Sequence, residues 1–109
     1  MAAMRRALEK HPDTTVVLPH LGADEFELAE ALLDDFPRLW LDTTMMFGDF
    51  FPNEPDRGIL ARRADRILYG TDFPNIPFDW DREQRNLARL LDDEARAKVM
   101  GGNAEKVYL

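Results

Sequence analysis

The chain has 109 residues and a net charge of −7, with 21 acidic against 14 basic residues and no cysteine. This length suits one small domain and falls short of the roughly 250 residues of a complete eightfold α/β barrel. The acidic balance excludes the basic footprint of a nucleic-acid-binding protein, and the lack of cysteine excludes disulfides, thiolate nucleophiles and cysteine-based zinc sites. With no long apolar run and no signal-like start, we expect a cytoplasmic protein without membrane contact.

The first half of the chain predicts two helices, each followed by a short apolar strand. Residues 1–10 form a helix that stops at His11-Pro12, because proline disfavours helix in the residue before it. A strand over residues 15–18 leads into Pro19-His20-Leu21-Gly22. Residues 24–35 have the apolar spacing and acidic first turn of an amphipathic helix, and residues 39–41 form the next strand, which ends in Asp42.

The second half begins with an apolar loop over residues 45–52, followed by a short helix over residues 55–64. A third strand over residues 66–69 leads into Gly70-Thr71-Asp72-Phe73-Pro74. Helices complete the chain, and their expected boundaries follow capping patterns. Asp81 with Gln84 predicts a capping box, Asp92 caps the next helix, Gly101-Gly102 ends it, and Asn103 caps the last one.

Continuous apolar strands separated by helices are typical of a parallel sheet covered by helices, so we expect a single α/β domain over residues 1–109. In such sheets, ligands bind at the carboxyl ends of the strands. His20 follows the first strand and Asp72 follows the third, so both are candidate catalytic residues at that edge. Asp42 points to the same edge, where we expect it to cap a loop. His11 precedes the first strand and is expected at the surface of the opposite edge.

Four stretches resemble, in order, the C-terminal portion of the amidohydrolase-related family. They are Val16-Val17-Leu18-Pro19-His20-Leu21-Gly22, Leu41-Asp42-Thr43, Arg66-Ile67-Leu68-Tyr69-Gly70-Thr71-Asp72-Phe73-Pro74 and Gly102-Asn103-Ala104-Glu105-Lys106-Val107-Tyr108-Leu109. The resemblance implies the last three βα units of a (β/α)₈ TIM-type barrel and its closing helix. It also implies a metal-dependent enzyme that hydrolyses or decarboxylates a small cyclic or carboxylated substrate.

The resemblance further implies roles for two residues. His20 matches a histidine that acts as base or orients the attacking water, and Asp72 matches an aspartate that binds or faces a divalent metal, commonly zinc. The family's His-x-His pair and its fifth-strand histidine have no counterpart in this sequence. Because a catalytic zinc needs about three protein ligands, we expect this chain alone to bind zinc weakly and to be inactive.

Alternatives remain open for these features. Asp72 can cap the following turn, and His20 can be a buried histidine bonded to a neighbouring loop. The apolar loop forms either a cover over the core or the wall of a substrate pocket; its large side chains are Met45, Met46, Phe47, Phe50 and Phe51. The whole chain can instead be a self-contained, non-catalytic α/β module that binds a partner or dimerises.

The edges of the sheet predict association. With the middle strand between the other two, the first and third strands have unpaired backbone groups, which invite pairing with another chain. We expect Val16, Leu18 and Leu68 to face the barrel interior and to be open to water in an isolated chain. The protein is therefore expected to form a homo-oligomer or to pair with a missing N-terminal half of the barrel.

Overall fold

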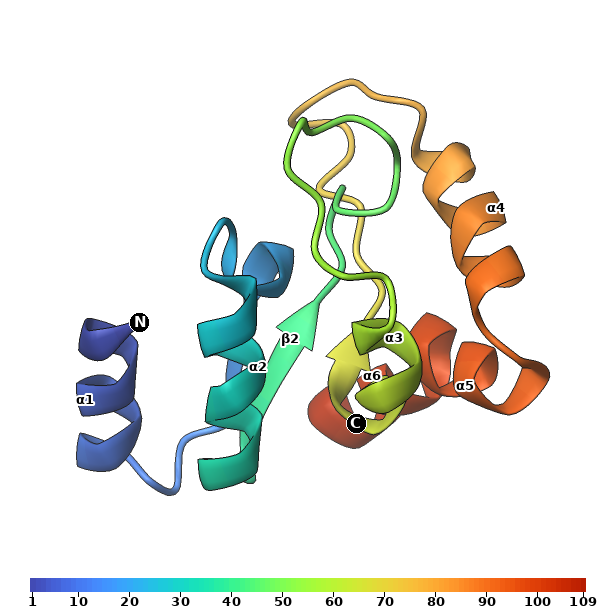
Figure 1. Cartoon of the computed structure of the whole chain (residues 1–109). Helices are drawn as coiled ribbons and strands as arrows, with labels where there is room; N and C mark the ends of the chain where they lie inside the picture. Colours follow the sequence, from blue (N-terminus) through green and yellow to red (C-terminus); the bar gives the residue numbers. More distant parts are fainter.

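The computed structural model describes all residues, 1–109, as one helix followed by three strand–helix units (Figure 1). The helices are α1 (Ala2–Lys10), α2 (Phe26–Asp35), α3 (Ile59–Arg62), α4 (Trp80–Leu90), α5 (Asp93–Ala97) and α6 (Asn103–Tyr108). The strands are β1 (Val16–Leu18), β2 (Leu39–Asp42) and β3 (Ile67–Leu68), and the shorter helical turns are η1 (Pro19–Gly22), η2 (Ala64–Arg66) and η3 (Lys98–Gly102). None of the helices combines the length and the apolar character needed to cross a membrane.

The three strands form one parallel sheet in the order β1-β2-β3, as the sequence predicted. Leu39 lies beside Val16, and Leu41 lies between Leu18 and Ile67. Neighbouring residues in this register share a face of the sheet, because side chains alternate between the two faces along each strand. Leu39, Leu41 and Ile67 are fully buried, which identifies this face as the one that meets the core.

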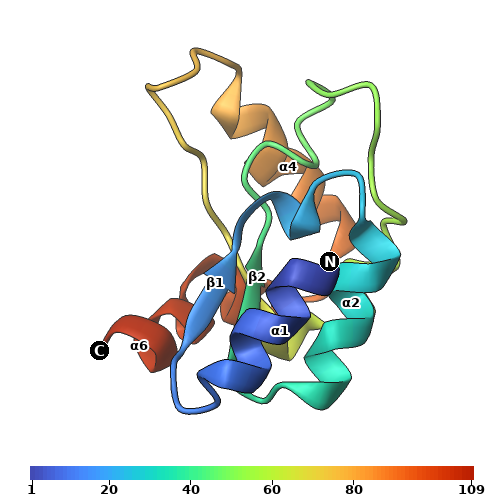
Figure 2. The same ribbon diagram turned by 90° about the vertical axis from the view of Figure 1, so that its left-hand side faces the viewer.

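The core is a single cluster to which α1 to α4 and the three helical turns η1 to η3 contribute. Its members include Leu8 of α1, Leu33 of α2, Leu60 of α3, Leu87 of α4 and Val99 of η3. Figure 1 shows α2 lying along β2, with α3, α5 and α6 grouped around the yellow strand β3. Helix α2 therefore covers the sheet on the face that carries Leu39 and Leu41, whereas Figure 2 shows α6 on the other side of β1 from α1 and α2.

The opposite face of the sheet carries Val17, Trp40 and Asp42, all only half-buried. The expectation that Val16 and Leu18 turn toward this side was wrong, since both pack against the core cluster. Leu68 does lie on this side, beside Asp42, but it is buried and not open to water. A shift of one residue along a strand exchanges the two faces. The prediction for β1 was shifted by one residue, so it assigned Val16 and Leu18 to the face that Val17 occupies.

Two expected helix caps differ in the structure, and a third is confirmed. Asp92 Oδ1 accepts a hydrogen bond from the backbone of Ala95 at 2.8 Å, as a capping side chain does. Helix α4 instead begins at Trp80, one residue before the expected cap Asp81, and has no side-chain cap. Asn103 does not cap α6, because its backbone is already helical and its side chain points elsewhere.

The glycine pair 101–102 also does not end the helix that precedes it. Both glycines lie in the π-helical turn η3, which runs directly into α6. Glycine tolerates right-handed helical backbone as well as the left-handed conformation of a helix end, so tertiary contacts decide which one forms. Asn103 supplies such a contact, since its Nδ2 donates to the backbone oxygens of Ala64 at 2.6 Å and Ile67 at 2.8 Å.

Candidate functional site

The segments that follow the three strands all lie at one end of the molecule. Figure 2 shows η1 at the top of β1 and the loops after β2 and β3 rising beyond it. Every non-glycine residue with a positive φ angle lies in these segments: His20, Leu21, Ala23, Asp24, Met45, Asp49 and Asp72. Left-handed backbone is unfavourable for residues with a Cβ and collects at functional sites, so this end of the sheet is the candidate site.

Glycine is required at two points of this edge. Gly22 has φ +91°, a conformation that side chains disfavour. A Cβ on Gly70 would lie only 2.7 Å from Thr44 Oγ1, so the loop after β3 approaches the loop after β2 through a residue without a side chain. The approach is held by a hydrogen bond of 3.3 Å from Gly70 N to Thr43 Oγ1.

His20 is a half-buried residue in η1, with φ 56°. Its ring nitrogen Nδ1 lies 3.0 Å from the backbone oxygen of Thr44, which follows β2. The other ring nitrogen, Nε2, has no hydrogen-bond partner in the structure, so it is free to act on a ligand. The contact with Thr44 agrees with the expectation of a histidine bonded to a neighbouring loop, and it leaves the catalytic interpretation open.

Asp42 at the end of β2 links the loops that carry His20 and Thr44. Its Oδ1 accepts hydrogen bonds from His20 N at 3.0 Å and from Thr44 N at 3.1 Å. The aspartate therefore caps backbone groups, as the sequence predicted. It does so across two strands as well as within its own loop.

Asp72 is exposed in the loop after β3, with φ 54°. Its Oδ1 accepts a hydrogen bond of 2.9 Å from Asn75 Nδ2, and the backbone of Asn75 donates to Asp72 O at 3.0 Å. The carboxylate thus stabilises the turn that follows it, while its position leaves it open to a ligand. No hydrogen bond joins Asp72 to His20, although both follow strands at the same edge.

The donors in this chain do not complete a metal site. No group of three or more histidine, cysteine, aspartate or glutamate side chains is arranged so that it could hold a metal ion. A catalytic zinc needs about three protein ligands, so His20 and Asp72 do not fit the ion by themselves.

The apolar loop after β2 divides between its two expected roles. Met45 and Phe47 are buried, whereas Phe50 is 47% exposed. Met46 and Phe51 line a cavity of about 230 Å³ that also touches His20, together with Ala23, Asp24, Phe26, Pro52 and Asn53. Part of the loop thus covers the core, and part forms the wall of a cavity beside the candidate catalytic histidine.

Two side chains of helix α4 hold this loop through polar contacts. Asn86 Nδ2 donates to the backbone oxygen of Phe47 at 2.6 Å, and Arg82 Nε forms an ion pair of 2.9 Å with Asp49. Arg57 holds the other oxygen of Asp49 at 3.2 Å. The amide of Asn86 and the two guanidinium groups beside Asp49 hold the pKa of its carboxyl below the usual range.

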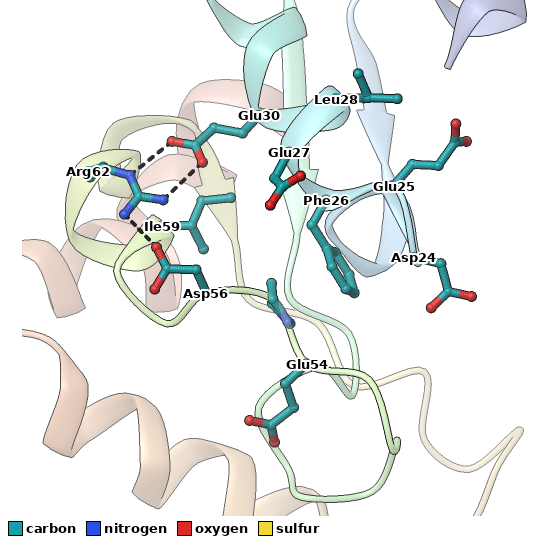
Figure 3. Close-up of a pocket in the computed structure, with 11 residues that line it drawn as sticks. Asp24, Glu25, Phe26, Glu27, Leu28, Glu30, Glu54, Asp56, Ile59 and Arg62 are labelled. Atoms are coloured by element: carbon teal, nitrogen blue, oxygen red, sulfur yellow. Dashed lines mark hydrogen bonds and ion pairs between the residues drawn. The ribbon is translucent and has the colours of Figure 1, made fainter.

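A larger cavity of about 590 Å³ lies between the start of α2 and the segment before α3 (Figure 3). Carboxylates dominate its lining, but their charges are taken up locally. Arg62 bridges Glu30 at 3.0 Å and Asp56 at 2.7 Å. This cavity contains neither His20 nor Asp72, so the smaller cavity beside His20 is the better candidate for a ligand site.

Glu83 is a buried carboxylate between α4 and the loop after β2, with 1% of its surface exposed. Neither of its oxygens makes a complete hydrogen bond, although the Thr43 hydroxyl and the backbone of Phe47 lie close enough to moderate its charge. Burial, together with the negative charge of Asp42, raises the pKa of Glu83 to about 7. The nearby hydroxyl of Tyr69 is also buried without a partner.

Comparison with known proteins identifies the family of the chain. The family model described as amidohydrolase matches residues 1–109. The chain belongs to the amidohydrolase family. A similar solved structure is that of an uncharacterized TIM-barrel protein from Bordetella bronchiseptica, with a TM-score of 0.75 and 27% identity over 95% of this chain. No curated protein matches the chain.

The amidohydrolase chain spans 37% of the length of that Bordetella protein. Its parallel sheet, with helices covering the core face, is therefore part of a TIM barrel, which confirms the expected fold. In TIM barrels the site lies where the strands end in loops. The loops that carry His20, Asp42 and Asp72 occupy this position in the amidohydrolase chain.

Sequence reasoning missed one residue near the candidate site of this amidohydrolase chain and gave another a lesser role. Glu83 stands four residues before Leu87, so helical spacing placed it on the buried face of α4. The spacing was therefore visible in the sequence, but only the capping pattern of Asp81 and Gln84 was used to interpret this helix. Asp42 was recognised as a capping residue, whereas its bond to His20 joins residues 22 positions apart and has no local signature.

Proposed function

We propose that the chain supplies the C-terminal half-site of an amidohydrolase-family barrel enzyme that hydrolyses or decarboxylates a small cyclic or carboxylated substrate. The observation that carries the proposal is the state of His20: one ring nitrogen is held by Thr44 O, the other is free, and the side chain borders an apolar cavity. A cytoplasmic location is part of the proposal.

In hydrolysis, His20 is proposed to accept a proton at Nε2 from the water that attacks the substrate carbonyl. The fixed Nδ1 contact orients the ring, and a positioned base of this kind accelerates proton transfer by about 10²- to 10⁴-fold. Asp72 is proposed to relay this proton to the leaving group as the bond between that group and the carbonyl carbon breaks, so that the water supplies both the hydroxyl on carbon and the proton of the leaving group. Its exposed carboxylate is compatible with this role, because the single bond from Asn75 leaves one oxygen free.

A divalent metal, zinc by resemblance, belongs to the proposal for a complete barrel only. This chain offers Asp72 as one ligand, and the other ligands would have to come from outside residues 1–109. The proton transfers proposed for His20 and Asp72 involve only these two side chains, the attacking water and the leaving group.

The cavity beside His20 supports a statement about the substrate. Its walls include Phe26, Met46 and Phe51, while Asp24 places a carboxylate at the rim. Its volume of about 230 Å³ is smaller than a typical complete ligand pocket of about 300–1,000 Å³. We propose that it takes an uncharged, apolar portion of the substrate next to the reacting carbon.

The test uses a complete barrel that carries these three βα units, assayed with lactones, aryl amides and aromatic carboxylates. Product analysis separates hydrolysis from release of carbon dioxide. We expect His20→Asn and Asp72→Asn each to lower kcat by orders of magnitude while the thermal melt stays unchanged, because Asp72→Asn keeps the side-chain shape and His20→Asn keeps a donor for Thr44 O in place of Nδ1.

Matched controls exist for both residues. His11→Asn and Asp13→Asn change the same residue types at exposed positions on the opposite edge of the sheet, and they should retain wild-type turnover. Wild-type turnover in His20→Asn would exclude the general base, and the same result in Asp72→Asn would leave that carboxylate with its turn-stabilising role alone.

A further inference from the structure

We propose that Asp42 is a positioning residue that sets the tautomer and orientation of the His20 imidazole. The inference rests on the proposed function for its catalytic consequence, while the positioning itself is a property of this chain. Asp42 does not touch the cavity beside His20. It would act only through the backbone groups that it binds.

The contacts form a closed arrangement between two loops. Oδ1 of Asp42 accepts from His20 N at 3.0 Å and from Thr44 N at 3.1 Å, and Thr44 O lies 3.0 Å from His20 Nδ1. One carboxylate oxygen therefore binds both the backbone N–H of the histidine and the backbone N–H of Thr44, the residue whose carbonyl oxygen contacts the ring. Losing that oxygen would release both ends of the imidazole contact at once.

The ring contact selects one tautomer. A backbone carbonyl oxygen only accepts hydrogen bonds, so the contact of 3.0 Å with Thr44 O requires that Nδ1 carries the proton. The neutral ring then has a bare lone pair on Nε2, which is the form that can accept a proton from water. An unconstrained imidazole populates both tautomers, so the Thr44 contact determines how much of the base is present.

The backbone at His20 needs such a restraint. His20 and Leu21 have φ angles of 56° and 51°, and the left-handed run continues through Gly22, Ala23 and Asp24. Left-handed backbone in residues with a Cβ relaxes unless surrounding contacts hold it. The bond from His20 N to Asp42 is the one side-chain contact to the backbone of this run.

The need is for an acceptor oxygen, because both donors are neutral backbone amides. Asparagine offers the same oxygen in the same place, so Asp42→Asn should preserve the arrangement. Alanine removes it. Serine can still reach the amide two residues ahead in its own turn, though not the amide of His20 across the sheet.

The experiment measures the imidazole tautomer by two-bond ¹⁵N–¹H correlation spectra of the 109-residue chain at one fixed pH. The protein has two histidines, and exposed His11 is an internal reference for an unconstrained ring. We expect His20 to be mainly the Nδ1–H tautomer in the wild type and in Asp42→Asn. In Asp42→Ala its spectrum should move to the pattern of His11.

Asp92→Ala is the matched control, because it removes a capping carboxylate of similar kind from α5, remote from His20. This variant should leave the His20 tautomer unchanged. If Asp42→Ala does not fold, Asp42→Ser gives the same comparison through amide hydrogen exchange, with faster exchange at His20 N and retained protection at Thr44 N.

Three results would overturn the proposal. They are a wild-type His20 with the same tautomer balance as His11, an unchanged His20 spectrum in Asp42→Ala or unchanged His20 exchange in Asp42→Ser, and a failure of Asp42→Asn to match the wild type. None of these readouts depends on turnover. An inactive complete barrel with a correctly positioned His20 would therefore contradict the proposed function and leave this inference intact.

Discussion

Several residues at or near the carboxyl edge of the sheet are held in conformations or surroundings that are locally unfavourable. His20 and Asp72 have left-handed backbone, and Glu83 is a carboxylate buried without a full hydrogen bond. A buried group of this kind favours its neutral form, because the charged form has lost its hydration. The structure therefore links the stability of the loop after β2 to the protonation of Glu83.

We predict that Glu83→Gln removes a pH dependence of folding. In the wild type the pKa of Glu83 is about 7 when folded, against a reference value of 4.5. The folded state then binds more protons between these values, so the free energy of unfolding falls as pH rises from 4.5 to 7, by about 3 kcal/mol in all. Glutamine keeps the shape without a charge, so the variant should be the more stable protein at pH 8.

Urea unfolding of both proteins at pH 5 and pH 8 measures this difference, and the comparison between variants cancels the contributions of all other groups. Glu94→Gln is the matched control, since Glu94 is exposed on α5. Equal pH dependence in wild type and Glu83→Gln would mean that the carboxylate is hydrated in solution.

At the scale of elements, the closing helix is tied to the sheet by one polar side chain. Asn103 is fully buried and joins α6 to the backbone of η2 and β3 through Ala64 O and Ile67 O. A buried carbonyl that loses its donor costs about 1–3 kcal/mol. The closing helix therefore depends on this amide as well as on apolar contacts.

We predict that Asn103→Ala lowers the free energy of unfolding by about 2–4 kcal/mol, because two buried carbonyl oxygens lose a donor together. Chemical denaturation at neutral pH measures the change. Asn75→Ala is the control: it removes one exposed bond to Asp72, and its effect should stay within about 0.5 kcal/mol. A similar small effect for Asn103→Ala would indicate that water replaces the amide.

Periodicity and loop chemistry predicted most of these elements, their order and the edge that carries His20 and Asp72. Such patterns are local, and so is the confirmed cap at Asp92. The errors occur where contacts between residues far apart in the sequence determine the local structure. Asn103 has the sequence of a cap but binds residues far earlier in the chain, and η3 continues through two glycines for the same reason. The link from Asp42 to His20 likewise exists only once β1 and β2 are paired.

At the scale of the whole molecule, the sheet is an open segment. β1 and β3 each pair only with β2, so each has one edge without a partner strand. Trp40 and Val17 are half-exposed on the face away from the core. Strand edges with these properties pair readily with other strands.

We therefore predict that the isolated chain forms dimers or larger assemblies, despite its net charge of −7. Size exclusion with light scattering measures the mass directly. Adding an excess of a barrel fragment that supplies the missing strands should reduce self-association if the same edges are used. A monodisperse monomer with a cooperative melt would instead favour the self-contained module.

A further prediction at this scale concerns zinc. The chain has no cluster of three ligands, so calorimetric titration should give weak binding without a defined stoichiometry. His20→Ala and Asp72→Ala should change the isotherm little. A tight one-to-one isotherm lost in both variants would mean that ligands come together in the assembled oligomer.

The left-handed run from His20 to Asp24 also divides the molecule into parts that open at different rates. Segments with unfavourable backbone and few buried contacts exchange their amide hydrogens through local fluctuations, while central strands exchange only on global unfolding. Amides of the exposed residues Ala23 and Asp24 should therefore exchange early, and those of Leu39 and Leu41 last. The turn at Ala23 and Asp24 can therefore change conformation many times while the strands beneath it stay folded.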